Sequence, residues 1–107
     1  MNYHRQKVVI ALGASASTLV DIAGADSIGL IMPAAFTGTE VAVYVAATAS
    51  ATPVPLYDES GNAVTATVAA STAVGLWTAD SFPWQWVQLV SNGTEAAARE
   101  ITLVLKD

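Results

Sequence analysis

Apolar and polar residues alternate along several short segments of this chain, most clearly between residues 27 and 47. Alternate positions of the segment 39–47 carry three valines, namely Val41, Val43 and Val45. Successive side chains of a β-strand point to opposite faces, so this pattern predicts a strand with one buried side. We expect the preceding strand, over 27–32, to end at a corner formed by Pro33, followed by Phe36 as a buried aromatic plug.

Similar segments recur along the rest of the chain. With the two strands above they number about eight, at a spacing of roughly 8–12 residues that is typical of a β-sandwich or barrel. The others are 7–12, 19–22, the hairpin 56–64, 64–70, 74–77, 84–90 and 101–105. No segment carries a sustained helical repeat of apolar residues. We therefore predict an all-β, single-domain antiparallel fold over residues 7–107, preceded by an N-terminal arm over residues 1–6.

Turn residues separate these segments. Gly61-Asn62 and Asn92-Gly93 are expected to form tight hairpin turns, because both residue types tolerate a positive φ. The prolines at 53 and 55 predict an extended edge segment. The segment 95–100 has helix propensity, but it is too short to form a stable helix alone.

The chain is poor in charge. Charged residues make up 12% of its 107 residues and apolar residues 53%, whereas globular proteins average about 25% charged residues. Two interpretations remain open. Either part of the apolar surface is covered by a partner, or small residues such as alanine raise the apolar count without forming adhesive patches.

Charge and segment length exclude several partners. The formal net charge is −5 and no basic stripe occurs, so we expect no binding of nucleic acid. No apolar run approaches the ~18 residues that span a bilayer, so we expect no membrane partner. The polar N-terminus lacks the apolar region of a signal peptide. We therefore expect the protein to remain, or to be assembled, in the cytoplasm of the producing cell.

The sequence predicts no enzyme, metal site or cofactor. It has no cysteine and a single histidine, which excludes thiolate sites and paired-histidine zinc motifs. The acidic residues do not have the spacing of a calcium loop, and they do not suggest the paired carboxylates of a glycosidase. No nucleophile elbow or glycine-rich phosphate loop occurs. We therefore expect no catalytic, metal-binding or cofactor-binding residues.

Two groups of residues are candidates for binding a partner. In the N-terminal arm these are Tyr3, His4 and Arg5, which would lie on an acidic partner surface unless the arm is a disordered tail. The second group is an aromatic cluster formed by Trp77, Phe82, Trp84 and Trp86. Three interpretations of this cluster remain open: core filling, a protein–protein contact or a platform for stacking sugars. Alternation places Trp84 and Trp86 opposite Val87 and Leu89, so one of these pairs is expected outside the core.

Several segments together resemble a family of small virion proteins of tailed bacteriophages, over roughly residues 8–106. The segments that carry the resemblance are 29–38 (GLIMPAAFTG), 56–64 (LYDESGNAV), 68–71 (VAAS), 87–94 (VQLVSNGT) and 97–105 (AAREITLVL). Arg99 is placed like an arginine that precedes the last strand in that family. One departure is Trp84-Gln85-Trp86, where the family has an Arg-Tyr strand.

These virion proteins are similar to capsid decoration, or cement, proteins. The resemblance implies a β-sandwich of jelly-roll type that binds the outside of a phage head. It also implies two kinds of partner. These are the major capsid protein and further copies of this chain, which would form a dimer or trimer. The alternative is a carbohydrate-binding module of a phage tail or fibre, using the tryptophan cluster. We further predict that Arg99 is partly buried and pairs with an acid or with loop carbonyls.

Overall fold

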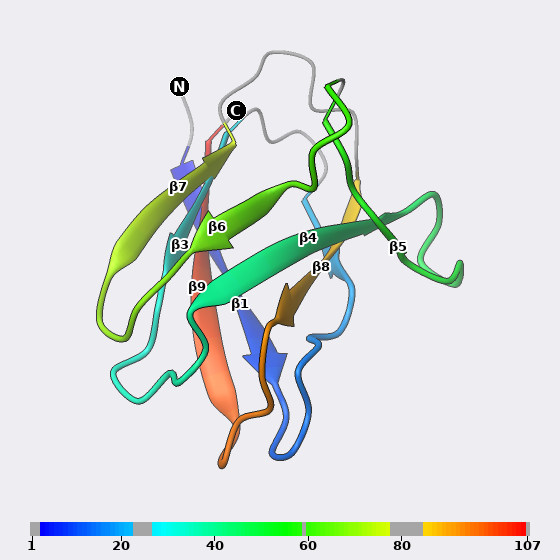
Figure 1. The fold of residues 1–107 in the computed structure, drawn as a ribbon. Helices are drawn as coiled ribbons and strands as arrows, with labels where there is room; N and C mark the ends of the chain where they lie inside the picture. The colour runs from blue at the N-terminus through cyan, green and yellow to red at the C-terminus, as the bar shows by residue number, and fades with distance from the viewer. Residues whose placement is uncertain (1–2, 23–26, 59, 78–84, 107) are drawn as a thin grey trace.

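The computed structural model describes residues 3–22, 27–58, 60–77 and 85–106 (Figure 1). These residues form nine strands and no helix. The strands are β1 (Tyr3–Ile10), β2 (Val20–Asp21), β3 (Ser27–Ile31), β4 (Glu40–Ala46), β5 (Val54–Pro55), β6 (Thr65–Thr67), β7 (Ala73–Trp77), β8 (Trp86–Ser91) and β9 (Arg99–Lys106).

The strands form two antiparallel sheets that pack face to face (Figure 1). The first sheet has the order β1-β9-β3-β7, and the second has the order β2-β8-β4-β5 with β6 also paired to β4. Apart from the two-residue β5, the strands of the first half of the chain pair in reverse order with those of the second half: β1 with β9, β2 with β8, β3 with β7 and β4 with β6. This nested order is that of a jelly roll, so the predicted sandwich is confirmed.

One hydrophobic core fills the space between the sheets. The predicted alternation holds in β4 and β9, where the inward positions are 0–2% exposed. In β4 these are Val41, Val43 and Val45, and in β9 they are Ile101, Leu103 and Leu105. Phe36 is buried in the same cluster, as expected of a plug between β3 and β4.

The first strand begins earlier than the alternation predicts. Residues 3–6 are paired with residues 103–106 of β9, in register with the rest of β1. The predicted arm over residues 1–6 is therefore wrong for residues 3–6, which belong to the sheet. The physical reason is that the eight-residue β9 offers backbone hydrogen-bonding groups along its whole length, and a polar edge segment can pair with them without burying an apolar face.

The Asn92-Gly93 turn also differs from expectation. β8 and β9 lie in different sheets, so residues 92–98 cross between sheets and do not close a tight hairpin. Neither Asn92 nor Gly93 has a positive φ, whereas Gly61 has a φ of 84° in the hairpin after β5. The predicted turn at Asn92-Gly93 is thus wrong, and the predicted turn at Gly61-Asn62 is confirmed at Gly61.

Candidate protein interface

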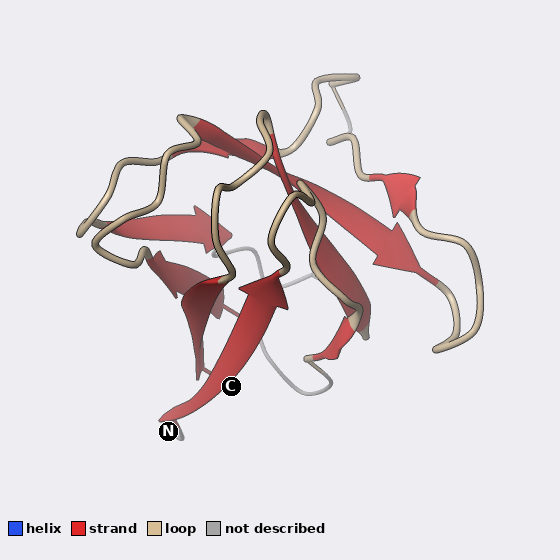
Figure 2. Cartoon of the chain, turned by 90° about the horizontal axis from the view of Figure 1, so that it is seen from below, coloured by secondary structure: helices blue, strands red, loops and turns tan. Residues whose placement is uncertain are grey.

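Three loops gather at one end of the sandwich, seen from that end in Figure 2. They are residues 11–19 after β1, 32–39 after β3 and 92–98 after β8. Backbone hydrogen bonds join the first and third loops, from Gly13 N to Glu95 O at 2.9 Å and from Glu95 N to Ala14 O at 3.2 Å. Because loop backbones cannot use the ladder of a sheet, such cross-loop bonds satisfy groups that would otherwise be buried unpaired.

Glu95 joins all three loops. Its side chain is 0% exposed, and three donors reach its carboxylate. Thr37 donates from its backbone N to Oε1 at 3.0 Å and from its hydroxyl to Oε2 at 2.7 Å. Arg99 donates from Nε to Oε1 at 2.9 Å. We call these three residues the Glu95 clamp.

Two opposing effects act on the charge of Glu95. Burial raises the pKa of its carboxyl group, because a charge is less stable away from water. The hydrogen bonds from Thr37 and the hydrogen bond and positive charge of Arg99 outweigh burial, so the pKa lies below its ordinary value. Both carboxylate oxygens are occupied, so the clamp acts as a structural tie between loops.

The predicted environment of Arg99 is confirmed. Its side chain is 15% exposed and pairs with Glu95. Glu95 itself was missed, because its segment was interpreted only through its helix propensity. The four-residue spacing between Glu95 and Arg99 was the available signal, since opposite charges at this spacing attract one another on a helical turn and here they pair in an irregular loop.

The predicted partner-binding residues are not brought together where the structure describes them. Arg5 is exposed on β1, in the first sheet. Tyr3 and His4 precede it in β1 and Trp77 ends β7, but their side chains lie outside the described part of the structure. Phe82 and Trp84 also lie outside the described residues. Trp86 lies in β8, in the second sheet.

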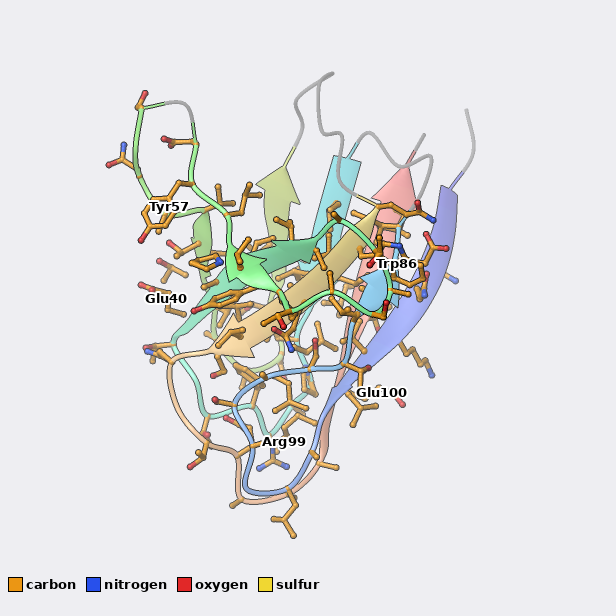
Figure 3. The ribbon with its side chains drawn as sticks, turned by 90° about the vertical axis from the view of Figure 1, so that its right-hand side faces the viewer. Glu40, Tyr57, Trp86, Arg99 and Glu100 are labelled. Carbon is orange, nitrogen blue, oxygen red and sulfur yellow. The ribbon has the colours of Figure 1, made fainter. Side chains whose placement is uncertain are left out.

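Trp86 does not fill the core. It is half-buried, whereas Val87 and Leu89 on the other side of β8 are 1% and 0% exposed. Trp86 is paired with Ala46 of β4, which places Tyr44 diagonally beside it on the same face. Figure 3 shows Trp86 well apart from Tyr57, the other labelled aromatic residue. The described aromatic side chains therefore do not form one continuous platform.

The outer face of the first sheet is a second candidate surface for binding a partner, besides the surface around Trp86. Val9 is 44% exposed and Ile31 is 45% exposed, although both are apolar. They lie on the side of β1 and β3 that faces away from Val8 and Leu30, which are 2% and 1% exposed. This face was not among the surfaces predicted from the sequence, which were the N-terminal arm and the aromatic cluster. An apolar residue at an outward position of an alternating strand was the available signal.

The described residues contain no group of three or more histidine, cysteine, aspartate or glutamate side chains that could hold a metal ion. Within the same residues, no helix is long and apolar enough to cross a membrane. Comparisons with protein-family models, with curated proteins and with solved structures found no match for this chain.

Proposed function

We propose that this chain is a structural protein of a bacteriophage head, a decoration protein that binds the outer surface of the assembled capsid lattice. In this proposal its partners are the major capsid protein and further copies of itself, and its place is the outside of the virion. It has no catalytic activity, and it contributes by binding.

The observation that carries the proposal is the exposed apolar face of the first sheet, in a chain with few charges. Monomeric soluble proteins rarely leave contiguous apolar patches larger than a few hundred Å² in water, and such large patches mark interaction sites. The jelly-roll topology adds an analogy only, since the fold occurs in viral capsid proteins and also in lectins.

The proposed mechanism is thermodynamic. A protein that binds the assembled lattice, and does not bind its separated subunits, stabilises the lattice by mass action. Copies that bridge neighbouring subunits bind more tightly than single contacts allow, because the second contact forms at a high effective concentration. A rigid β-sandwich suits this role, since little conformational entropy is lost on binding.

The test uses mature capsids of the phage that encodes this chain, stripped of or grown without the protein. We expect the purified chain to co-sediment with these capsids at a fixed number of copies and to raise their melting temperature in calorimetry. Unassembled capsid subunits serve as the control and are expected to bind weakly. Capsids that neither bind the chain nor change in melting temperature would contradict the proposal.

A second candidate function is a carbohydrate-binding module of a tail or fibre, favoured by the outward position of Trp86 beside Tyr44. Aromatic side chains on a sheet face can stack on sugar rings. This candidate predicts binding to a glycan array that disappears in Trp86→Ala, without any association with capsids.

A further inference from the structure

The first sheet presents a row of small and apolar residues to solvent. Ile31 of β3 lies between Thr102 of β9 and Ala73 of β7. The next outward position of β9 is Val104, which is half-buried, as is Thr102. Among the described residues, no strand packs on this side of the sheet.

Two glycines keep part of the face flat. Gly29 and Gly75 are paired across β3 and β7, and Gly29 is paired with Val104 on its other side. A Cβ atom added at Gly75 would meet nothing within 4 Å, and one at Gly29 would only reach contact distance of neighbours such as the Val104 Cβ at 3.9 Å. The backbone is therefore open to close approach by another protein surface, which is one use of glycine inside a strand.

Positive charge borders this face. Arg5 and Lys7 are exposed on β1, and the Lys7 Nζ atom lies 3.2 Å from Oε1 of Glu100. Among the side chains that the structure describes on this face, these are two cations against one carboxylate, in a chain with a net charge of −5. Three further described carboxylates belong to the second sheet or to the hairpin beside it: Asp21, Glu40 and Asp58. Counted over the described side chains, the face is thus locally positive on a negative molecule.

This charge distribution selects the occupant. A second copy docked face to face about a twofold axis that runs across the strands would bring its own Arg5 and Lys7 against those of the first, and like charges across an interface oppose association. Two molecules of net charge −5 also repel at long range. A protein surface with acidic groups around an apolar centre would replace the local repulsion by attraction, because its acidic groups would lie against Arg5 and Lys7.

We propose that the outer face of the first sheet is the docking surface of this protein, and that its occupant is a protein surface with an apolar centre and an acidic rim. This inference rests on the proposed function, in which that surface belongs to the capsid lattice. The outer face of the second sheet, which carries Trp86, then points away from the lattice.

The experiment measures binding of the full chain to capsids of the encoding phage, by sedimentation over a range of chain concentrations. Gly75→Gln places a neutral side chain on the proposed surface without an internal contact. Its matched control is Gly93→Gln, because a Cβ at Gly93 also meets nothing within 4 Å and the residue lies in the loop after β8. We expect Gly75→Gln to weaken binding by about tenfold or more and Gly93→Gln to bind as the wild type does.

A second pair of variants tests charge. Arg5→Gln and Thr65→Glu each lower the net charge by one, the first on the proposed surface and the second on the outer side of β6. Only Arg5→Gln is expected to weaken binding, and added salt is expected to reduce the difference from the wild type.

The outcomes separate the two proposals. If the wild type does not bind capsids, the proposed function fails. The proposal that the docking face binds an acidic surface of the capsid lattice then fails with it. If the wild type binds and both glycine variants bind equally well, the function stands and the docking face is wrong. If the wild type sediments as a dimer that Gly75→Gln dissociates, a second copy occupies the face and the inference is overturned.

Discussion

Arg99 donates a hydrogen bond from Nε to Oε1 of Glu95 at 2.9 Å, and the glutamate side chain is completely buried. The pair closes residues 95–99 on themselves, at the point where β9 begins with Arg99. Because Thr37 donates to the same carboxylate from the loop after β3, the pair also joins the loop between β3 and β4 to the loop between β8 and β9 at one end of the molecule. The Glu95 clamp is therefore the tie on which we expect the stability of this end to depend.

Removing Arg99 should be costly, because it leaves a buried carboxylate with less compensation. We expect Arg99→Ala to lower the free energy of unfolding by about 3 kcal/mol, the scale observed when one partner of a buried pair is removed. Lys7→Ala is the control, since the pair of Lys7 with Glu100 is 65% and 52% exposed and should contribute less than about 1 kcal/mol. Urea denaturation measures both, and equal losses would contradict the clamp.

Acid should weaken the clamp. The folded pKa of Glu95 lies below its ordinary value, so its ionised form stabilises the fold above the unfolded pKa of about 4.3. This stabilisation is lost as the pH falls from the unfolded pKa through the folded one. We expect the melting temperature, measured from about pH 6 down to about pH 3, to depend less on pH in Glu95→Gln than in the wild type. Thr37→Val, which removes one hydrogen bond to the carboxylate, should be intermediate, and identical profiles would refute the role of Glu95.

Gly38 is confined by its neighbours. A Cβ atom at this position would collide with the Ser91 hydroxyl and lie 2.9 Å from a ring carbon of Phe36. We expect Gly38→Ala to destabilise the fold by about 1–3 kcal/mol, the usual cost of overpacking. Ser91→Ala in the same chain should recover part of this loss. Gly75→Ala is the matched control and should be neutral or slightly stabilising, so a similar loss in both glycine variants would argue against a local collision.

Asn92 holds the loop after β8 through hydrogen bonds of its side chain, and not through the positive φ that the sequence predicted. Its Oδ1 accepts hydrogen bonds from the backbone N of Thr39 at 3.0 Å and of Glu40 at 3.3 Å, and its Nδ2 donates to the Thr39 hydroxyl at 2.8 Å. We expect Asn92→Ala to lower stability by about 1–2 kcal/mol, whereas Asn62→Ala, at an exposed position of the hairpin after β5, should change it little. Chemical denaturation of the two variants would show whether this difference exists.

The sequence alone determined the strands and their inward faces. Val41, Val43 and Val45 lie inward because a strand repeats every two residues, and this repeat is a local property that each segment carries by itself. The corner at Pro33 and the positive φ of Gly61 are local in the same sense. The jelly-roll order was predicted only through a resemblance to a known family, and periodicity does not specify it.

Tertiary structure decided what joins distant parts of the chain. Residues 3–6 became part of a strand because β9 lay beside them. Glu95 became a buried tie because Thr37, 58 positions earlier, reached its carboxylate. Trp86 faced outward because Val87 and Leu89 occupied the core side of β8. For residues 3–6 and for Glu95 the deciding partner is remote in sequence. For Trp86 the local repeat leaves either face of β8 possible as the core side. Each outcome therefore depends on which surfaces meet when the two sheets close.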